Sequence, residues 1–547
     1  MPTALPFVDL ERVPFTAPGS RFVVRRSRGR IEILHVRYEV PIDQCVAARI
    51  DCVTDGRIRA LGGHLEVDAV RIAILGEEVR VLGPGCRVES ADDGAPDVRV
   101  AAAPARTVLS GAGARRSELG DSEFVEAADS VVGRWMDRLP AVAGGRTEMA
   151  RQCWWVLGAN TLEIAVPGGA AEQGAPRRRT VVVPSKMGYV ALWQWDAYFI
   201  AIGLRSGAPE LALEQLETAF GACEDGQLPD VVHDGGVLAS SRDLPPADRE
   251  RLEASGSRSG DHGVVPLTKP PLGAWAADRV LEALPADRRR RLMARWFPVL
   301  TANQDWWFRV GDSDGDGVPE YAHPYSSGLD DSPIFDGAFP VVTPDLLAYL
   351  VVQDEVLARW ADDLGDAVPG ARRIGESCRA RSASTRRALD GLWDPRRQMF
   401  EARDAGGPGA LPRTIVSLLA CFAGGLPDDR MRGLIADIED EHRFAGAWPL
   451  ATVSRDERDF EPQTMWRGPV WINTNYLVAE GLERCGHPQR ARRLRRATLD
   501  LVERAGGPVE YMDPRTGNRP PAAAANFSWS AALYLDLAVR EAAEPPR

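Results

Sequence analysis

The spacing of apolar residues changes once along the chain, and this change limits the folds that the sequence can adopt. Between residues 21 and 92, short runs rich in Val and Ile partly alternate with polar residues, and glycine-containing turns separate them. Such alternation is typical of antiparallel strands. After about residue 125, apolar residues recur at helical spacing instead. We therefore expect two domains: an N-terminal antiparallel β-domain, of β-sandwich type, over residues 1–115, and a mainly α domain over residues 116–547.

The helical part divides into segments. Long, polar, Gly/Pro-rich loops alternate with short connections between these segments. Thr343, Pro344 and Asp345 illustrate one clear start, an N-cap followed by proline at the first helical position. Twelve helices in this arrangement fit a toroid of six helical hairpins with the long loops at one mouth, and a plain helical solenoid is the alternative. The segments lie near residues 147–163, 192–206, 209–222, 271–283, 286–308, 343–364, 368–393, 411–424, 427–438, 470–484, 488–505 and 526–541.

Charge and composition exclude several classes of partner. The formal net charge of −12 argues against nucleic acid and anionic membranes, which both require a basic face. The sequence contains no run of 18 apolar residues, and its start has neither the basic nor the apolar region of a secretory signal. Eight scattered cysteines without a CxxC pair are typical of reduced core residues. We expect a cytoplasmic protein; no feature of the sequence bears on its oligomeric state.

The stretch GDSDGDG (residues 311–317) matches two common motifs. A GxSxG nucleophile elbow requires a helix directly after the serine, but glycines and Pro319 follow here. Asp312, Asp314 and Asp316 match the first, third and fifth positions of an EF-hand loop, yet the twelfth position is His323 in place of Glu. A calcium site with another ligand set therefore stays open, beside a tight turn in which the Asp side chains bind their own backbone.

Acidic residues recur next to tryptophans in the loops of the helical part. Asp330 and Asp331 lie side by side between Gly328 and Pro333, Glu510 precedes a DPRTG turn, and Asp196 interrupts an apolar helix start in LWQWDAYFIAIGL. Indole rings stack on the apolar face of a sugar, and carboxylates bind its hydroxyl groups. Hydrolysis of a glycoside further requires two carboxyl groups, one protonated and one ionised. The pattern thus favours a carbohydrate site.

The ordered set WQWDAYFIAIGL, TKPPLGAW, DSDGDGVPEYAHPYSSGLDDSP, WRGPVWINTNYL, VEYMDPRTG and FSWSAAL over residues 147–541 resembles glycoside hydrolase family 63, in its mannosylglycerate/glucosylglycerate hydrolase-like branch. The resemblance implies an (α/α)6 barrel that cleaves α-linked glycosides with inversion. It implies Asp330 as general acid and Glu510 as general base. The substrate-binding residues that it implies are Asp196, Trp193, Trp195, Trp466, Arg467, Asn475 and Trp529.

Some positions differ from the family pattern. Lys269 stands where many relatives carry Gln, and a positive charge at the pocket favours an anionic substrate. Asp331 stands where Asn is common, and the turn of Asp312, Asp314 and Asp316 resembles a segment that holds structural calcium in some relatives, although catalysis requires no cofactor. The long polar loop at residues 224–268 is either a lid or a decorated connection.

Together these features predict an inverting α-glycoside hydrolase, of glucosidase or mannosidase type, that acts on a small glycoside or oligosaccharide. A phosphorylase on the same toroid uses phosphate and lacks a general base, so the presence of Glu510 argues against this alternative. A sugar isomerase needs a histidine near the sugar carbonyl, and the chain offers only His323 there. A non-catalytic carbohydrate-binding or regulatory protein with the same toroid is the remaining alternative.

Overall fold

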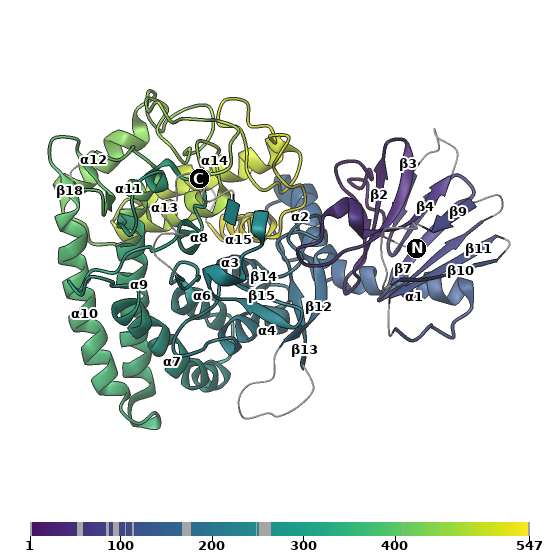
Figure 1. Ribbon diagram of the computed structural model, residues 1–547, viewed down its shortest axis with the longest axis horizontal. Helices are drawn as coiled ribbons and strands as arrows, with labels where there is room; N and C mark the ends of the chain where they lie inside the picture. Colours follow the sequence, from purple (N-terminus) through teal and green to yellow (C-terminus); the bar gives the residue numbers. More distant parts are fainter. Residues whose placement is uncertain are drawn as a thin grey trace.

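The change from strands to helices is present in the three-dimensional structure of the protein. The computed structural model describes residues 3–51, 58–83, 87–90, 98–103, 105–111, 114–166, 177–247, 249–250, 264–407 and 410–544. Figure 1 shows antiparallel sheets at the N-terminal end of the chain and a larger, helix-rich body beside them. The strands of the N-terminal part are β1 (Phe15–Thr16), β2 (Phe22–Ser27), β3 (Arg30–His35), β4 (Val46–Asp51), β5 (Ile58–Leu61), β6 (His64–Val67), β7 (Val70–Leu75), β8 (Glu78–Leu82), β9 (Arg87–Ser90), β10 (Val98–Ala103) and β11 (Arg106–Gly111).

These strands form two antiparallel sheets, in the orders β1-β2-β3-β4-β9 and β10-β11-β8-β7-β6-β5. The predicted strands after residues 21, 30, 46, 64 and 78 are all present. Helix α1 (Asp121–Met136), which sequence periodicity did not single out, lies against β6 and β7. Its Phe124 and Val125 pack on Ala73 of β7. The helix was missed because the Ala/Gly/Pro-rich stretch before it resembles a connection.

All twelve predicted helical segments contain helix, with ends that differ by a few residues. One of them, at 411–424, is divided between α11 and a 3-10 turn at Ala420–Ala423. Within the described residues, no helix is both long enough and apolar enough to cross a bilayer. The helices are α2 (Thr147–Ala159), α3 (Gln194–Leu204), α4 (Pro209–Gly221), α6 (Gly273–Leu281), α7 (Ala286–Arg309), α8 (Pro324–Ser327), α9 (Pro344–Leu364), α10 (Ala371–Gly391), α11 (Ile415–Leu419), α12 (Asp428–Glu439), α13 (Ile472–Arg484), α14 (Pro488–Ala505) and α15 (Ser528–Ala543).

The helices pack largely in sequence order, and the last one returns to the helices at the start of the helical body. Consecutive pairs α3–α4, α9–α10 and α13–α14 are in contact, and α15 packs against both α2 and α3. Small antiparallel sheets of short strands lie between the helices. They pair β12 (Thr161–Val166) with β13 (Arg177–Val182), β14 (Leu192–Trp193) with β15 (Val231–His233) and β16 (Gly236–Leu238), β17 (Val341–Val342) with β20 (Arg403–Asp404), and β18 (Trp393–Asp394) with β19 (Met399–Phe400).

The sheets and the helical body share a buried seam. The ring of Phe7 lies 5.4 Å from that of Trp155 on α2. The buried ammonium of Lys186 donates hydrogen bonds to Thr16 Oγ1 (3.3 Å) and to the carbonyl of Ala17 (3.2 Å). Burial lowers the pKa of Lys186 to about 7. Apolar residues of both parts belong to one continuous core. The β region is therefore close-packed against the helical body, as residues inside a protein are.

Candidate active site

The acidic pair of the SSGLDDSP stretch lies in an irregular connection between two short helical turns. Helix α8 ends at Gly328, whose φ of +71° is left-handed, and a 3-10 turn begins at Pro333. A Cβ at Gly328 would lie 2.3 Å from the ring of Trp195, so the position requires glycine for space as well as for conformation. The two bracketing residues thus hold the loop against the indole.

The two acids of this loop face different surroundings. Asp330 lines a cavity, and its side chain is 25% exposed. Asp331 is absent from the cavity lining; its Oδ1 accepts a hydrogen bond from the Trp466 backbone N–H at 2.8 Å. Asp331 therefore fixes the loop to the WRGPVW segment while Asp330 faces the cavity.

Glu510 approaches the same cavity from an extended segment after α14. Tyr189 donates its hydroxyl to Glu510 Oε1 at 2.8 Å, and the Ala524 backbone N–H donates to Oε2 at 2.8 Å. Burial raises the pKa of Glu510 to about 7, against these two hydrogen bonds, which lower it. A carboxyl group poised near neutral pH and held by two donors is well suited to exchange a proton.

A buried cluster of charges lies beside these two acids. Lys269 and Asp230 are both almost fully buried, and Lys269 Nζ lies 3.1 Å from Asp230 Oδ1 and 3.8 Å from Asp330 Oδ1. The ammonium also donates to the Tyr325 carbonyl at 2.6 Å. Asp196, in the first turn of α3, is buried next to this cluster, and burial raises its pKa well above the usual range, although Lys269 opposes that shift.

Aromatic rings make up much of the remaining wall. Trp466 and Trp471 are stacked, with ring centroids 3.7 Å apart, and Trp195 meets Trp529 edge to face at 5.2 Å. The buried Nε1 of Trp529 has no hydrogen-bond partner within the described residues, which leaves a donor for a ligand hydroxyl. The full lining is Pro184, Tyr189, Trp193, Trp195, Asp196, Lys269, Gly328, Asp330, Met465, Trp466, Trp471, Glu510, Phe527 and Trp529.

Two of the residues expected to bind substrate do not line this cavity. Arg467 forms a two-point ion pair with Asp336, at 3.0 and 2.9 Å. Asn475, on α13, uses its side-chain amide to bind backbone groups of Leu450 and Trp471. Both side chains hold neighbouring loops in place. His323 is also outside the lining; its Nδ1 caps α8, and burial lowers the pKa of its imidazole to about 3.

Sequence reasoning did not single out Tyr189 or Asp230. Tyr189 lies 321 residues before its partner Glu510, and only folding brings them together. Asp230 had a local signal that could have found it, an acid directly before the apolar residues Val231 and Val232. It lies in the long polar loop at residues 224–268, of which residues 248 and 251–263 are outside the described part of the chain.

The aspartate-rich turn brings together a different set of acids from the one expected. Asp312, Asp314 and Glu320 each offer a carboxylate oxygen within 4.8 Å of the others, whereas Asp316 accepts a hydrogen bond from the Val318 backbone N–H. Asp312 also accepts from two backbone N–H groups of the turn. The oxygen-only ligands suit Ca²⁺, and the turn also holds its own backbone. None of these acids lines the cavity.

Two carboxyl groups on one cavity among indole rings are the arrangement of a carbohydrate-cleaving enzyme, and comparison with known proteins agrees: the protein is a glycoside hydrolase. The sequence model of the mannosylglycerate hydrolase MGH1-like glycoside hydrolase domain matches residues 189–530. The chain therefore belongs to this family, in the mannosylglycerate hydrolase-like branch of glycoside hydrolase family 63.

Individual relatives cover the helical part of the chain. A mannosylglycerate hydrolase of Thermus thermophilus is 30% identical over 412 residues, which are 65% of this chain and 96% of the relative. A glucosylglycerate hydrolase of Mycolicibacterium hassiacum is 27% identical over 435 residues, 65% of this chain and 94% of the relative. A crystal structure of a T. thermophilus mannosylglycerate hydrolase in complex with Tris is similar at a TM-score of 0.56 and 26% identity, covering 72% of this chain and 99% of that one.

Proposed function

We propose that the protein hydrolyses a small α-glycoside with inversion, with Asp330 as general acid and Glu510 as general base. The observation that carries this proposal is the convergence of both carboxyl groups on one cavity walled by indole rings. Inversion requires about 6.5–9.5 Å between the carboxyl groups, because a water molecule must fit between Glu510 and the sugar. No metal or cofactor takes part; calcium at Asp312, Asp314 and Glu320 would stabilise a turn.

Asp330 and Glu510 account for both proton transfers of the reaction. Glu510 takes a proton from water while the water oxygen attacks the anomeric carbon from the face opposite the leaving group. The glycosidic C–O bond breaks, and Asp330 gives its proton to the departing oxygen. Tyr189 and the Ala524 backbone N–H hold the Glu510 carboxylate in place during the transfer.

The scaffold that we propose is an (α/α)6 barrel formed by residues 116–547, preceded by the β-domain of residues 1–115. The contacts between consecutive helices, together with the packing of α15 on α2 and α3, support a closed ring. The cavity then lies at one mouth of the ring, where the loops that carry Asp330 and Glu510 meet.

The relatives' names suggest the first substrates to test, α-mannosylglycerate and α-glucosylglycerate. The cavity has a volume of about 50 Å³, which is room for about one or two water molecules. Lining side chains therefore move before a sugar ring enters. Lys269 faces this cavity, but its ammonium already forms an ion pair with Asp230. The negative charge of Asp230 therefore weakens the attraction of Lys269 for an anionic substrate.

A proton NMR time course tests the proposal. The protein is incubated with a panel of α-glucosides and α-mannosides, including both glycerates, and the anomeric signals of the released sugar are followed. We expect the β-anomer first, and the α-anomer only through later mutarotation. Initial release of the α-anomer would exclude inversion. Absence of cleavage across the panel, with and without calcium, would favour a non-catalytic carbohydrate-binding protein.

The pH dependence gives a separate prediction. Glu510 acts as a base only when ionised, and its pKa is about 7 in the folded protein. We expect kcat/KM to fall as the pH drops below about 7, by about tenfold per pH unit, because one proton inactivates the free enzyme. The measurement is kcat/KM from about pH 5 to pH 9. An acid limb near pH 4.5, the usual value for Glu, would contradict the assignment.

A further inference from the structure

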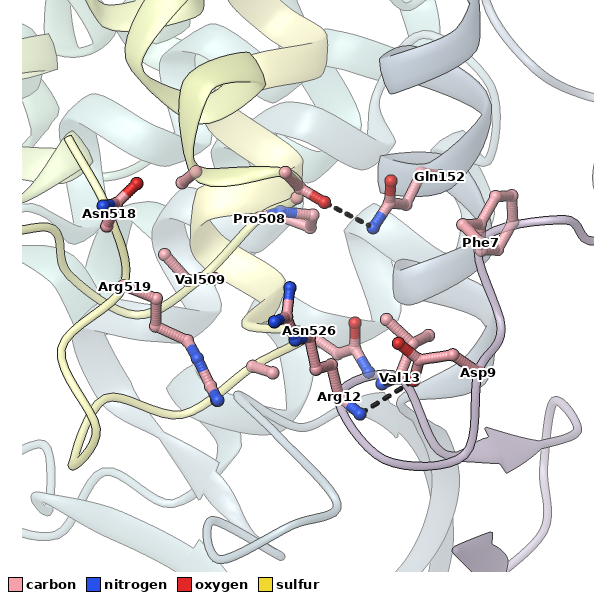
Figure 2. A pocket seen from close by; sticks show the side chains of 14 residues that line it. Phe7, Asp9, Arg12, Val13, Gln152, Pro508, Val509, Asn518, Arg519 and Asn526 are labelled. Atoms are coloured by element: carbon pink, nitrogen blue, oxygen red, sulfur yellow. Dashed lines mark hydrogen bonds between the residues drawn. The ribbon is translucent and has the colours of Figure 1, made fainter. Parts of the chain in front are cut away.

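A second, larger cavity lies behind the active site. Its volume is about 550 Å³, and segments from both ends of the chain line it. Figure 2 shows the N-terminal segment on one side, α2 above, and the segments that flank Glu510 on the other side. The lining residues are Phe7, Asp9, Arg12, Val13, Gln152, Ala505, Gly506, Gly507, Pro508, Val509, Asn518, Arg519, Ala525 and Asn526.

Two cations and a buried amide face this cavity. Arg12 and Arg519 reach in from opposite segments (Figure 2), and neither forms an ion pair within the described residues. Arg519 donates to the Ala523 carbonyl at 3.2 Å. The Asn526 side chain lines the cavity, 9% of the residue is exposed, and no described residue hydrogen-bonds its amide. The amide is not among the fully enclosed side-chain groups, so it is open to the cavity and available to a ligand or to solvent.

The acid at the rim does not cancel this positive charge. Asp9 Oδ1 accepts three backbone N–H groups of the following turn, from Glu11, Arg12 and Val13. These hydrogen bonds hold the carboxylate in place, and it keeps its negative charge. Two guanidinium groups and one carboxylate leave one net positive charge on the lining, so the cavity favours an anion.

The wall between the two cavities is one layer of chain. Val509 and Asn526 line the second cavity, whereas their chain neighbours Glu510 and Phe527 line the active site. At Asn526 the backbone turns with a left-handed φ of +56°. The two segments are paired, because the Glu510 N–H donates to the Ala524 carbonyl at 2.9 Å and the Ala524 N–H donates to Glu510 Oε2. The residue two positions before Asn526 thus contacts the carboxylate of Glu510 directly.

We propose that the second cavity binds a small anionic polyol, a molecule with a carboxylate or phosphate beside hydroxyl groups, and that binding alters the setting of Glu510. Arg12 and Arg519 bind the anionic group, and Asn526 binds a hydroxyl. The volume lies in the range of about 300–1,000 Å³ that small-molecule sites occupy. Phe7 is the only aromatic residue among the described residues of the lining, so stacking of a neutral sugar, as in the active site, is not what this cavity offers.

Isothermal titration calorimetry tests the binding, with glycerol 3-phosphate, D-glycerate and glycerol as probes. We expect both anions to bind the wild-type protein, and glycerol to bind far more weakly. Arg12→Gln and Arg519→Gln each weaken the binding by about tenfold or more, the loss of one charge-assisted hydrogen-bonding partner. Comparison of the two anions distinguishes a phosphate ligand from a carboxylate ligand.

Two control variants locate the bound anion. Arg515→Gln makes the same charge change on the same loop, but Arg515 pairs with Asp513 outside the cavity, so the Kd stays unchanged. Asp330→Asn alters the active site only and also leaves the Kd unchanged. If Asp330→Asn changes the Kd while the Arg12 and Arg519 variants do not, the anion binds in the active site and the proposal is wrong. If neither anion binds the wild-type protein, the proposal is also wrong.

Coupling to Glu510 rests on the proposed function, and it has its own measurement. Glycerol 3-phosphate at a concentration near its wild-type Kd changes kcat/KM and the acid limb of its pH profile in the wild-type protein, and changes them much less in Arg12→Gln. If Arg12→Gln weakens binding yet the anion never affects the rate, the site exists without coupling. If Glu510→Gln retains full hydrolysis, the proposed base is wrong, while the binding result stands.

Discussion

Hydrolysis is expected to fall by about 10²–10⁴-fold when Asp330 is replaced by Asn, and by a similar factor when Glu510 is replaced by Gln. Each change keeps the shape of the side chain but removes the group that gives or takes a proton. The measurement is kcat/KM on any glycoside that the wild-type protein cleaves. Retention of more than about a tenth of the activity by either variant would contradict its assigned role.

The nature of the leaving group separates the two roles. A glycoside with an acidic leaving group, such as 4-nitrophenol, departs without protonation, so Asp330→Asn loses much less activity on it. Glu510→Gln loses as much as before, because activation of water is still required. Equal recovery of both variants would contradict the assignment of acid and base.

Asp331→Asn is the matched control for Asp330→Asn. It makes the same substitution one residue away, and the new amide oxygen can still accept from the Trp466 N–H. We expect it to keep most of the activity, so a large loss would mean that the loop, and not the carboxyl group of Asp330, is what the reaction needs.

The stability of Glu510→Gln provides a check that the fold is intact. Glu510 carries its proton up to about pH 7 in the folded protein, but only up to about 4.5 when unfolded. Folding therefore takes up a proton between these values, and this residue makes the wild type less stable as the pH rises through them. The variant lacks this penalty. It should be the more stable protein above pH 7, by up to about 3 kcal/mol, and lose the advantage below about pH 4.5.

Lys269→Met is expected to lower the free energy of unfolding by about 3–5 kcal/mol, because it leaves a buried carboxylate without its partner. Lys269 and Asp230 are 3% and 1% exposed, so water cannot replace the lost ammonium. The Tyr325 carbonyl loses its donor as well. Urea denaturation at neutral pH measures the change, and a loss below about 1 kcal/mol would contradict this account of the pair.

A double variant isolates the contribution of the uncompensated charge. Burial raises the pKa of Asp230 to about 7, with Lys269 opposing the shift. Combining Lys269→Met with Asp230→Leu removes both charges, and we expect it to recover a large part of the lost stability. A double variant as unstable as Lys269→Met alone would mean that packing, not charge, causes the loss.

The sequence predicted the helices well because their signal is local. Most of the segments carry an apolar face at helical spacing, and this spacing survives any arrangement of the helices, whereas α3 is buried on all sides. The segment at 147–163 was extended too far, since Thr161 and Leu162 belong to strand β12, which follows α2 almost directly. Short paired strands such as β14 and β15 have too few residues to show a period.

The candidate site was predictable only in part, for a related reason. Asp196, Asp330 and Glu510 stand out because a charge within an apolar or turn-rich stretch is locally unusual, and all three line the cavity. The side chains of Arg467 and Asn475 lie in the same motif as Trp466 and Trp471, yet they face the supporting loops instead. Which side of a segment meets the cavity is decided by tertiary packing, which a local motif does not encode.

The seam between the sheets and the helical body limits how the β region can be gained or lost in evolution. Lys186 has its acceptors on Thr16 and Ala17, and Trp155 has Phe7 as a neighbour, so each part completes the other. The Thermus relative is matched over 96% of its length by only 65% of this chain. A lineage that gained or lost the β region would also have had to change residues along the seam. Deletion of the β region alone would leave the Lys186 ammonium without its hydrogen-bond acceptors and would expose the Trp155 ring to solvent.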